Sequence, residues 1–216
     1  MIELPIVKKL GVVDYVECLY LMQNFVSERQ SGQSDEIWVL QHDAVFTMGA
    51  MADEGDIISY DHNVPVIRTD RGGKITFHGL GQIVIYLLLD VKRLGLNTRQ
   101  LVNKLERAVV HMLSQFEIKA YTSMNNPGIY VDQYCNEKIS SIGLKINKDG
   151  FSYHGISVNF DIDKEMFSHI NPCGQPGLKV VNFVEMLRTN LSVDIITAED
   201  VLVDYIIENL YHESNK

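Results

Sequence analysis

Two stretches of the chain repeat apolar residues at helical spacing, and each follows a typical helix start. Asp14 is followed three residues later by Glu17, and Asn97 is followed in the same way by Gln100. A side chain at the first of these positions can accept the backbone N–H three residues on, which fixes the start of a helix. The pattern predicts a helix of roughly four turns after Asp14 and a longer one from Asn97 to Phe116.

Runs of β-branched and aromatic residues elsewhere in the chain are typical of strands. The predicted strands are Glu36–Gln41, Val64–Thr69, Ile83–Asp90, Ala120–Ser123, Gly128–Asp132, Lys138–Ile146 and Phe151–Asp161. The turn sequence Asn147–Gly150 predicts a hairpin between the last two. We also expect a short helix over Val180–Arg188 and a last helix from Thr197 to about Tyr211. Because the strands are grouped, the pattern favours an α+β fold, a mixed sheet packed by helices, over a doubly wound parallel sheet.

Composition and charge narrow the classes of protein to which this chain can belong. With 216 residues, 46% hydrophobic and 22% charged, it can bury a core, and we expect one domain over residues 1–216. A net charge of −9 disfavours nucleic acid as a partner, because phosphate contacts need a cationic surface. The apolar run Ile83–Leu89 is far shorter than the roughly 20 residues of a membrane span, and no signal peptide is apparent. We therefore expect a cytoplasmic protein.

The three cysteines have different surroundings. An odd number of cysteines without a secretory signal argues against a disulfide framework, and no Cys-x-x-Cys or His-x-x-x-His spacing suggests a metal site. Cys18 lies in an apolar helix pattern, where we expect a buried structural role. Cys135 lies in a polar loop, which is compatible with a reactive or an idle thiol. Cys173 lies between Pro172 and Gly174, so we expect it on a turn that exposes backbone N–H groups to a cleft.

A glycine-rich segment, Arg71–Gln82, precedes the predicted strand Ile83–Asp90 and holds four glycines. Glycines allow a backbone to approach a ligand closely and to expose N–H donors. The alternative is a tight turn with a salt-bridged Arg71 and a hydrogen-bonded His78. Neither the phosphate-loop pattern nor the dinucleotide-binding pattern is present, so a nucleotide phosphate is not indicated.

Two further segments carry groups with possible chemistry. Lys138 heads the segment Glu137–Gly143, where a solvated lysine is the ordinary interpretation and a buried base is the functional one. Gly155 and Ser157 are small residues in a predicted strand. They indicate either a close crossing of strands or a narrow slot for a linear ligand.

These four segments, including the one that holds Gly155 and Ser157, occur in the order found in one enzyme family, and three of them match its motifs most specifically. The run Arg71-Gly72-Gly73-Lys74-Ile75-Thr76-Phe77-His78, the segment Lys138–Gly143 and the turn Pro172–Gly174 resemble motifs of the lipoyl(octanoyl) transferases. The resemblance extends from about Trp38 to Val184. Three matches in order are far more specific than any one of them alone.

The sequence departs from the family pattern in two places. Leu80 stands where the family usually has proline, which loosens the turn but removes no reactive group. Ser157 stands where alanine is usual, which narrows and polarises the expected slot.

The resemblance implies a fold shared with biotin protein ligases and lipoate ligases. It implies transfer of an octanoyl group from the thioester of octanoyl-acyl carrier protein to a lysine of a lipoyl domain. Cys173 would be the nucleophile that carries the acyl group, and Lys138 its acid–base partner. The residues implied to line the acyl site are Arg71, Gly72, Gly73, Lys74, Ile75, Thr76, Phe77, His78, Ser141, Ile142, Gly143, Gly155, Ile156 and Ser157.

The resemblance also implies the partners. The acceptors would be the lipoyl domains of 2-oxoacid dehydrogenase E2 subunits and the glycine cleavage H protein. Acyl carrier proteins and lipoyl domains are commonly acidic, so we expect cations near the cleft, with Arg68, Arg71, Lys74 and Lys179 as candidates. No ATP or metal cofactor is expected, because a thioester is already an activated acyl donor.

Three alternatives remain open at the level of the sequence. A lipoate–protein ligase of the same fold would need a site for an acyl adenylate and has no use for Cys173. An amidotransferase that moves octanoyl or lipoyl groups between carrier proteins would also work through a cysteine. A non-catalytic acyl-binding module would need neither Lys138 nor Cys173.

Overall fold

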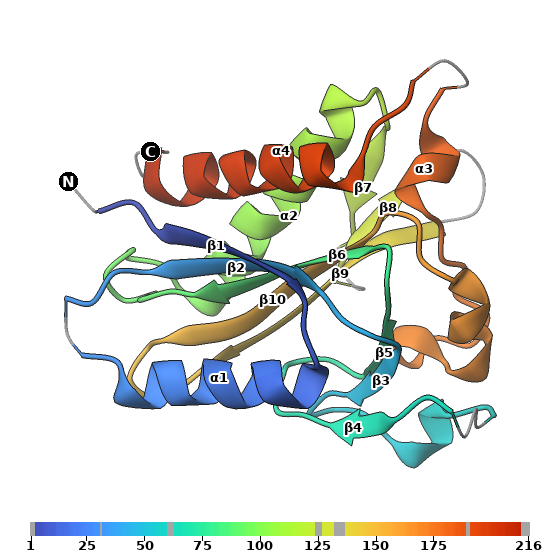
Figure 1. The fold of residues 1–216 in the computed structure, drawn as a ribbon, viewed down its shortest axis with the longest axis horizontal. Helices are drawn as coiled ribbons and strands as arrows, with labels where there is room; N and C mark the ends of the chain where they lie inside the picture. The colour runs from blue at the N-terminus through green and yellow to red at the C-terminus, as the bar shows by residue number, and fades with distance from the viewer. Residues whose placement is uncertain are drawn as a thin grey trace.

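The computed structural model describes residues 3–30, 32–59, 63–123, 127–131, 137–188 and 191–212. Within these residues the main sheet has seven strands in the order β1-β2-β6-β10-β9-β8-β7 (Figure 1). In that order their bounds are Ile6–Val12, Glu36–Gln41, Gln82–Leu88, Ser152–Asn159, Glu137–Ile146, Ile129–Val131 and Ala120–Thr122. β1 pairs with β2 in parallel, and the other neighbours pair antiparallel. The predicted α+β fold with a mixed sheet is therefore confirmed.

A second, smaller sheet lies beside the first and carries part of the glycine-rich segment. It consists of β4 (Val66–Arg68), β3 (Val45–Met48) and β5 (Ile75–His78), with β3 in the middle. The strand β5, which lies inside the glycine-rich segment Arg71–Gln82, was not predicted from the sequence. Its four residues are all buried, and pairing with β3 stabilises them as a strand.

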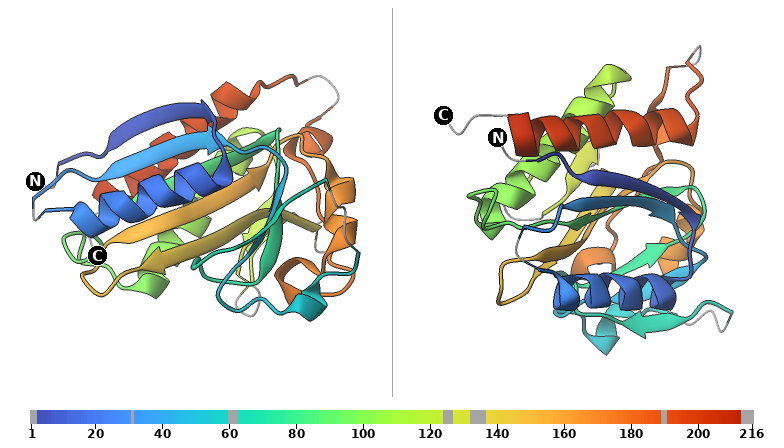
Figure 2. Two further views of the ribbon diagram at one scale, coloured as in Figure 1. Left: turned by 60° about the horizontal axis from the view of Figure 1, so that its bottom comes forward. Right: turned by 60° about the vertical axis from the view of Figure 1, so that its left-hand side comes forward.

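Helices cover both faces of the main sheet (Figures 1 and 2). α1 (Tyr15–Glu28) packs on one face, and α2 (Thr98–Gln115) and α4 (Ile195–Ile207) pack on the other. Side chains alternate along β6: Ile83 and Ile85 belong to the core under α2 and α4, whereas Val84 and Tyr86 belong to the core under α1. Burial on both faces explains why this strand is an unbroken apolar run.

The predicted helix starts and hairpin are confirmed at the level of single hydrogen bonds. Asp14 Oδ1 accepts the backbone N–H of Glu17 at 2.9 Å. Asn97 and Gln100 form a reciprocal capping box, with both hydrogen bonds at 2.9 Å. In the turn between β9 and β10, Asn147 Oδ1 accepts three successive backbone N–H groups at 3.0 Å.

Other predicted elements were wrong or incomplete. Over residues 180–188 only one helical turn forms, α3 (Phe183–Met186), and the last helix starts earlier than expected because Asp194 caps it. The edge strand β1 was missed because it is exposed along its whole length and has no alternating pattern. Short helical turns complete the described chain: η1 Glu54–Asp56, η2 Lys164–His169, η3 Pro172–Gly174 and the π-turn η4 Glu208–His212.

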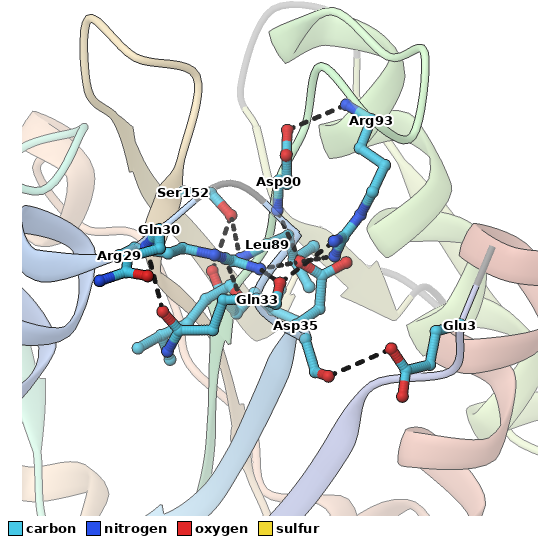
Figure 3. A network of polar contacts seen from close by, with 12 residues as sticks. Glu3, Arg29, Gln30, Gln33, Asp35, Leu89, Asp90, Arg93 and Ser152 are labelled. Carbon is cyan, nitrogen blue, oxygen red and sulfur yellow. Dashed lines mark hydrogen bonds and ion pairs between the residues drawn. The ribbon is translucent and has the colours of Figure 1, made fainter.

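A buried ionic cluster joins elements at one end of the main sheet (Figure 3). Asp35 is fully buried beside Arg29 and Arg93, with N–O distances of 2.5 and 2.8 Å. It also accepts the backbone N–H of Asp90 at 2.7 Å and the hydroxyl of Tyr211 at 2.6 Å. A buried carboxylate is stable only when it is paired and hydrogen-bonded. The cluster therefore ties the C-terminal η4 to the end of α1 and the start of β2.

Candidate active site

A thiol and an amine from distant parts of the chain meet at the centre of the candidate site. Lys138 Nζ, from β9, donates a hydrogen bond to Cys173 Sγ, from η3, at 3.0 Å. Lys138 is only 3% exposed, so the ordinary interpretation of a solvated lysine was wrong. Its backbone is fixed by a bridge to Val180, in which Lys138 N donates to Lys179 O and Val181 N donates to Lys138 O. The pair that the resemblance implied is thus brought within hydrogen-bond distance.

The turn that carries the thiol has an unusual backbone. Gly174 N donates to Asn171 O at 2.8 Å, and Gln175 N donates to Pro172 O at 3.1 Å. Pro172 has the restricted φ that suits the second position of such a turn. Cys173 follows with φ 57° and ψ 18°, a left-handed conformation that is normally left to glycine or asparagine. Strain of this kind clusters at functional sites, where neighbouring contacts hold it in place.

The side chain of Lys138 is held in place by contacts with Pro127, Gly128 and Tyr130. Pro127 O accepts a second hydrogen bond from Lys138 Nζ at 2.9 Å. Gly128 has φ +132°, and a Cβ there would lie 2.7 Å from Lys138 Nζ. The ring of Tyr130 lies 5.5 Å from the same nitrogen. Burial, with a smaller effect from Cys173, raises the pKa of Tyr130 to about 12, so its phenol is neutral near pH 7.

A cavity of about 400 Å³ extends from this pair along β9, β10 and β6. All the predicted lining residues border it except Phe77. Phe77 lies in β5 between Thr76 and His78, and its side chain packs in the apolar cluster with Phe46 and Phe167 instead. Its prediction as a lining residue was therefore wrong, because a contiguous motif in a strand presents neighbouring side chains to opposite faces.

The glycine-rich loop forms one wall of the cavity. Gly72 N donates to Leu144 O in β9 at 3.0 Å, which seats the loop on the sheet. The buried guanidinium of Arg71 donates to the backbone and hydroxyl of Thr47 at 2.5 to 3.1 Å and to Gly72 O at 3.0 Å. A Cβ at Gly49 would lie 2.7 Å from Arg71 Nη1. Arg71 thus braces the loop, and the prediction that it docks an acidic carrier is wrong for this buried side chain.

The strand register gives the direction of the cavity. Ser141 pairs with Ser157, Gly143 with Gly155, and Leu144 with His154, each step farther along β9 from Lys138. At roughly 3.3 Å per residue, Leu144 lies about 20 Å along the strand from Lys138. The cavity is therefore elongated, with the reactive pair near one end.

Gly155 itself has a packing reason to be small. A Cβ on this residue would overlap the carbonyl oxygen of Ile85 in β6. The close approach of the paired strand β6 therefore accounts for Gly155, although Gly155 also borders the cavity. Leu80, the departure from the family pattern, is 57% exposed at the tip of a turn and lies outside the cavity lining.

Polar groups surround the far end of the cavity. His154 Nε2–H donates to Asp70 at 2.9 Å, and this hydrogen bond lowers the pKa of Asp70 to about 2. His78 Nδ1–H donates to Gln82 Oε1 at 2.7 Å, and its ring stacks on Tyr15. Burial lowers the pKa of both imidazoles, so both are neutral near pH 7.

Sequence reasoning missed several residues at this end, among them Tyr15, Asp70, Tyr86 and His154. Tyr15 and Tyr86 come from an amphipathic helix and a buried strand, where aromatic side chains are expected in the core. The available signals were Asp70 beside the glycine-rich run and His154 beside Gly155.

The remaining thiols differ from Cys173. Cys18 is fully buried in α1, and burial raises the pKa of its thiol to about 12, which agrees with the expected structural role. Cys135 lies outside the described residues.

Among the described residues, no group of three or more histidine, cysteine, aspartate or glutamate side chains is arranged to hold a metal ion. In the same ranges no helix is long and apolar enough to cross a membrane.

Residues 14–205 match the lipoyl protein ligase A/B catalytic domain. The chain belongs to this family. A family relative named octanoyltransferase, from Polynucleobacter asymbioticus, is 41% identical over 212 residues, which cover 95% of this chain and 97% of the relative. An octanoyltransferase from Nitrosomonas europaea is 45% identical over 194 residues, which cover 86% and 93%. The resemblance drawn from the three motifs is therefore confirmed.

Solved structures support the same fold. A lipoate–protein ligase A bound with ATP has a TM-score of 0.76 at 16% identity, covering 97% of this chain and 86% of that one. A bi-partite lipoate protein ligase from Thermoplasma acidophilum has a TM-score of 0.75 at 15% identity, covering 96% and 84%. A biotin protein ligase from Aquifex aeolicus has a TM-score of 0.58 at 18% identity, covering 95% and 70%. The predicted kinship of fold with the lipoate and biotin ligases is confirmed.

Proposed function

We propose that the protein transfers an octanoyl group from octanoyl-acyl carrier protein to a lysine of lipoyl domains, through a thioester on Cys173. The observation that carries the proposal is the 3.0 Å hydrogen bond from the buried amine of Lys138 to Cys173 Sγ, beside an elongated cavity. Relatives named octanoyltransferase at 41% and 45% identity support the reaction. The acceptors would be lipoyl domains of 2-oxoacid dehydrogenase E2 subunits and the glycine cleavage H protein.

In the first half-reaction, the ammonium of Lys138 stabilises the thiolate of Cys173 by Coulomb attraction and a hydrogen bond. The thiolate attacks the thioester carbonyl. The new bond to Cys173 Sγ forms, the bond to the carrier's sulfur breaks, and Lys138 gives its proton to the departing thiolate. An acyl-thioester on Cys173 and a neutral amine on Lys138 remain.

In the second half-reaction, the amine of the acceptor lysine attacks the acyl-thioester. Lys138 takes the proton released by that amine, and Cys173 leaves as a thiolate. The product is an amide, and the site returns to its starting protonation state. This sequence gives ping-pong kinetics. An oxyanion forms in both halves, and the N–H groups of Gly174 and Gln175 are already engaged within the turn, so other donors must stabilise it.

The walls of the cavity suit an aliphatic chain. Ile75, Val84, Ile142 and Ile156 contribute apolar surface along its length. At about 0.8 kcal/mol per buried CH₂, an octanoyl tail gains on the order of 5 kcal/mol of binding free energy. We propose that neither ATP nor a metal takes part, because the thioester donor supplies the activation.

Intact-mass measurement after mixing with octanoyl-acyl carrier protein, without ATP or Mg²⁺, tests the proposal. We expect one octanoyl adduct on the wild-type protein, none on Cys173→Ala, and one on the control Cys18→Ala, which removes a buried thiol elsewhere. An adduct that survives in Cys173→Ala would rule out this nucleophile. A requirement for ATP and Mg²⁺ would favour the ligase alternative.

A further inference from the structure

A carboxylate with no role in the steps above is buried beside the reactive lysine. Glu106 lies on α2 and is only 8% exposed. Its neighbours Leu105, Ala108 and Val109 are apolar and fully buried in the core. A charged side chain in such surroundings costs free energy unless it has a partner. The partners of Glu106 therefore indicate why it is there.

The contacts of Glu106 lead directly to the reactive pair. Glu106 Oε1 accepts the backbone N–H of Gly128 at 3.3 Å. Gly128 packs against the Lys138 side chain, and the preceding carbonyl, of Pro127, accepts from Lys138 Nζ at 2.9 Å. The same nitrogen donates to Cys173 Sγ. The carboxylate, the segment Pro127–Gly128, the amine and the thiol thus form one connected chain of contacts.

Charge links the same groups. Burial raises the pKa of Glu106, whereas the hydrogen bond from Gly128 and the positive charge of Lys138 lower it. Coulomb attraction is mutual, so an ionised Glu106 stabilises the ammonium form of Lys138. Among the described residues, the neutral Tyr130 also interacts electrostatically with Glu106, Arg71 does so with Cys173, and Lys74 lies against the turn that carries Cys173.

We propose that Glu106 is the positioning residue of the active site. Its hydrogen bond to Gly128 holds the Pro127 carbonyl that aims Lys138 at Cys173, and its negative charge attracts the amine of Lys138. This inference rests on the proposed acyl transfer through Cys173. Glu106 does not border the cavity, so it acts on the lysine and not on the substrate.

Glu106→Gln tests the charge, because the amide retains the size and the acceptor oxygen. We measure the rate of octanoyl-adduct formation on Cys173 across pH. Removing the negative charge removes its attraction for the positive charge of Lys138, so the alkaline limb of the profile should move to lower pH. In Glu106→Ala, which also loses the hydrogen bond, the limiting rate should fall roughly 10- to 100-fold, with KM for the donor within about twofold.

Glu199→Gln is the matched control. Glu199 is a comparably buried glutamate on α4, packed on the same face of the sheet and absent from the cavity lining, and burial also raises its pKa. Its variant should keep the wild-type profile. Melting temperatures separate loss of folding from loss of positioning, and Glu106→Gln provides the test if Glu106→Ala does not fold.

The outcomes separate this inference from the proposed function. If the wild-type protein forms an adduct and the pH profile of Glu106→Gln superimposes on the wild-type pH profile, the inference is wrong and the acyl transfer stands. If the wild-type protein forms no adduct, both are wrong. If the alkaline limb moves in Glu106→Gln and stays in place in Glu199→Gln, the inference is supported.

Discussion

Gly128→Ala should move Lys138 away from Cys173 while leaving both of these residues unsubstituted. Gly128 has φ +132°, and a Cβ there would lie 2.7 Å from Lys138 Nζ, well inside van der Waals contact. The backbone of Gly128 is held by Glu106, and the buried lysine has little room to move aside. The methyl group must therefore push the amine away from the thiol, whose hydrogen bond is 3.0 Å long.

Two effects set the magnitude for Gly128→Ala. Alanine at this φ costs on the order of 1–3 kcal/mol of strain, which for a chain of this size lowers the melting temperature by roughly 2–12 °C. A displacement of about 1 Å between reacting groups costs on the order of 10²-fold in rate. We therefore expect a folded but less stable protein that acylates Cys173 at least 10²-fold more slowly.

Single-turnover acylation, followed by intact mass, measures the rate, and calorimetry measures stability. Gly11→Ala is the control, because Gly11 also has a positive φ, +69°, but a Cβ there would meet nothing within 4 Å. The control should lose some stability and keep its acylation rate. If Gly128→Ala acylates Cys173 at the wild-type rate, this glycine is not what gives the lysine access to the thiol.

Three further predictions concern stability, docking and pH. Asp35→Asn leaves two guanidinium groups without their carboxylate, so urea titration should show a loss of about 3–5 kcal/mol, while the folded variant still forms the acyl adduct. Lys74, half-exposed beside the thiol-bearing turn, should contribute to carrier docking: Lys74→Ala should raise KM for octanoyl-acyl carrier protein at low salt, but not KM for octanoyl-pantetheine. Burial lowers the pKa of His42, His78 and His154 below the ordinary value of 6.5, so below that pH the unfolded chain binds protons that the folded chain does not. The melting temperature should therefore fall as pH is lowered from 7 to 5, and a flat profile would contradict the neutral assignment of these imidazoles.

Much of the site could be predicted because its residues fall in short contiguous motifs. The residues predicted to line the site from the glycine-rich segment and from β9 border the cavity, with Phe77 the exception, whereas Leu144 of β9 borders it and was not predicted. The far end was not predicted, because Tyr15, Tyr86 and His154 come from three elements that the fold brings together. Glu106 had a faint signal, a charged residue within the apolar pattern of α2, which only its contact with Gly128 explains.

Local sequence patterns specify the helix caps and the hairpin turn of this protein, but not the exposed strand β1. The caps at Asp14 and Asn97 and the hairpin turn at Asn147 depend on hydrogen bonds between residues at most four positions apart, so the local pattern specifies them. The contact between Lys138 and Cys173 joins residues 35 positions apart, and no local preference determines it. Only the tertiary structure decides that the lysine is buried, that Arg71 braces a loop, and that a glutamate faces the reactive pair. These properties depend on which residues, distant in the sequence, pack together and exclude water from the site, and only the folded chain brings those residues together.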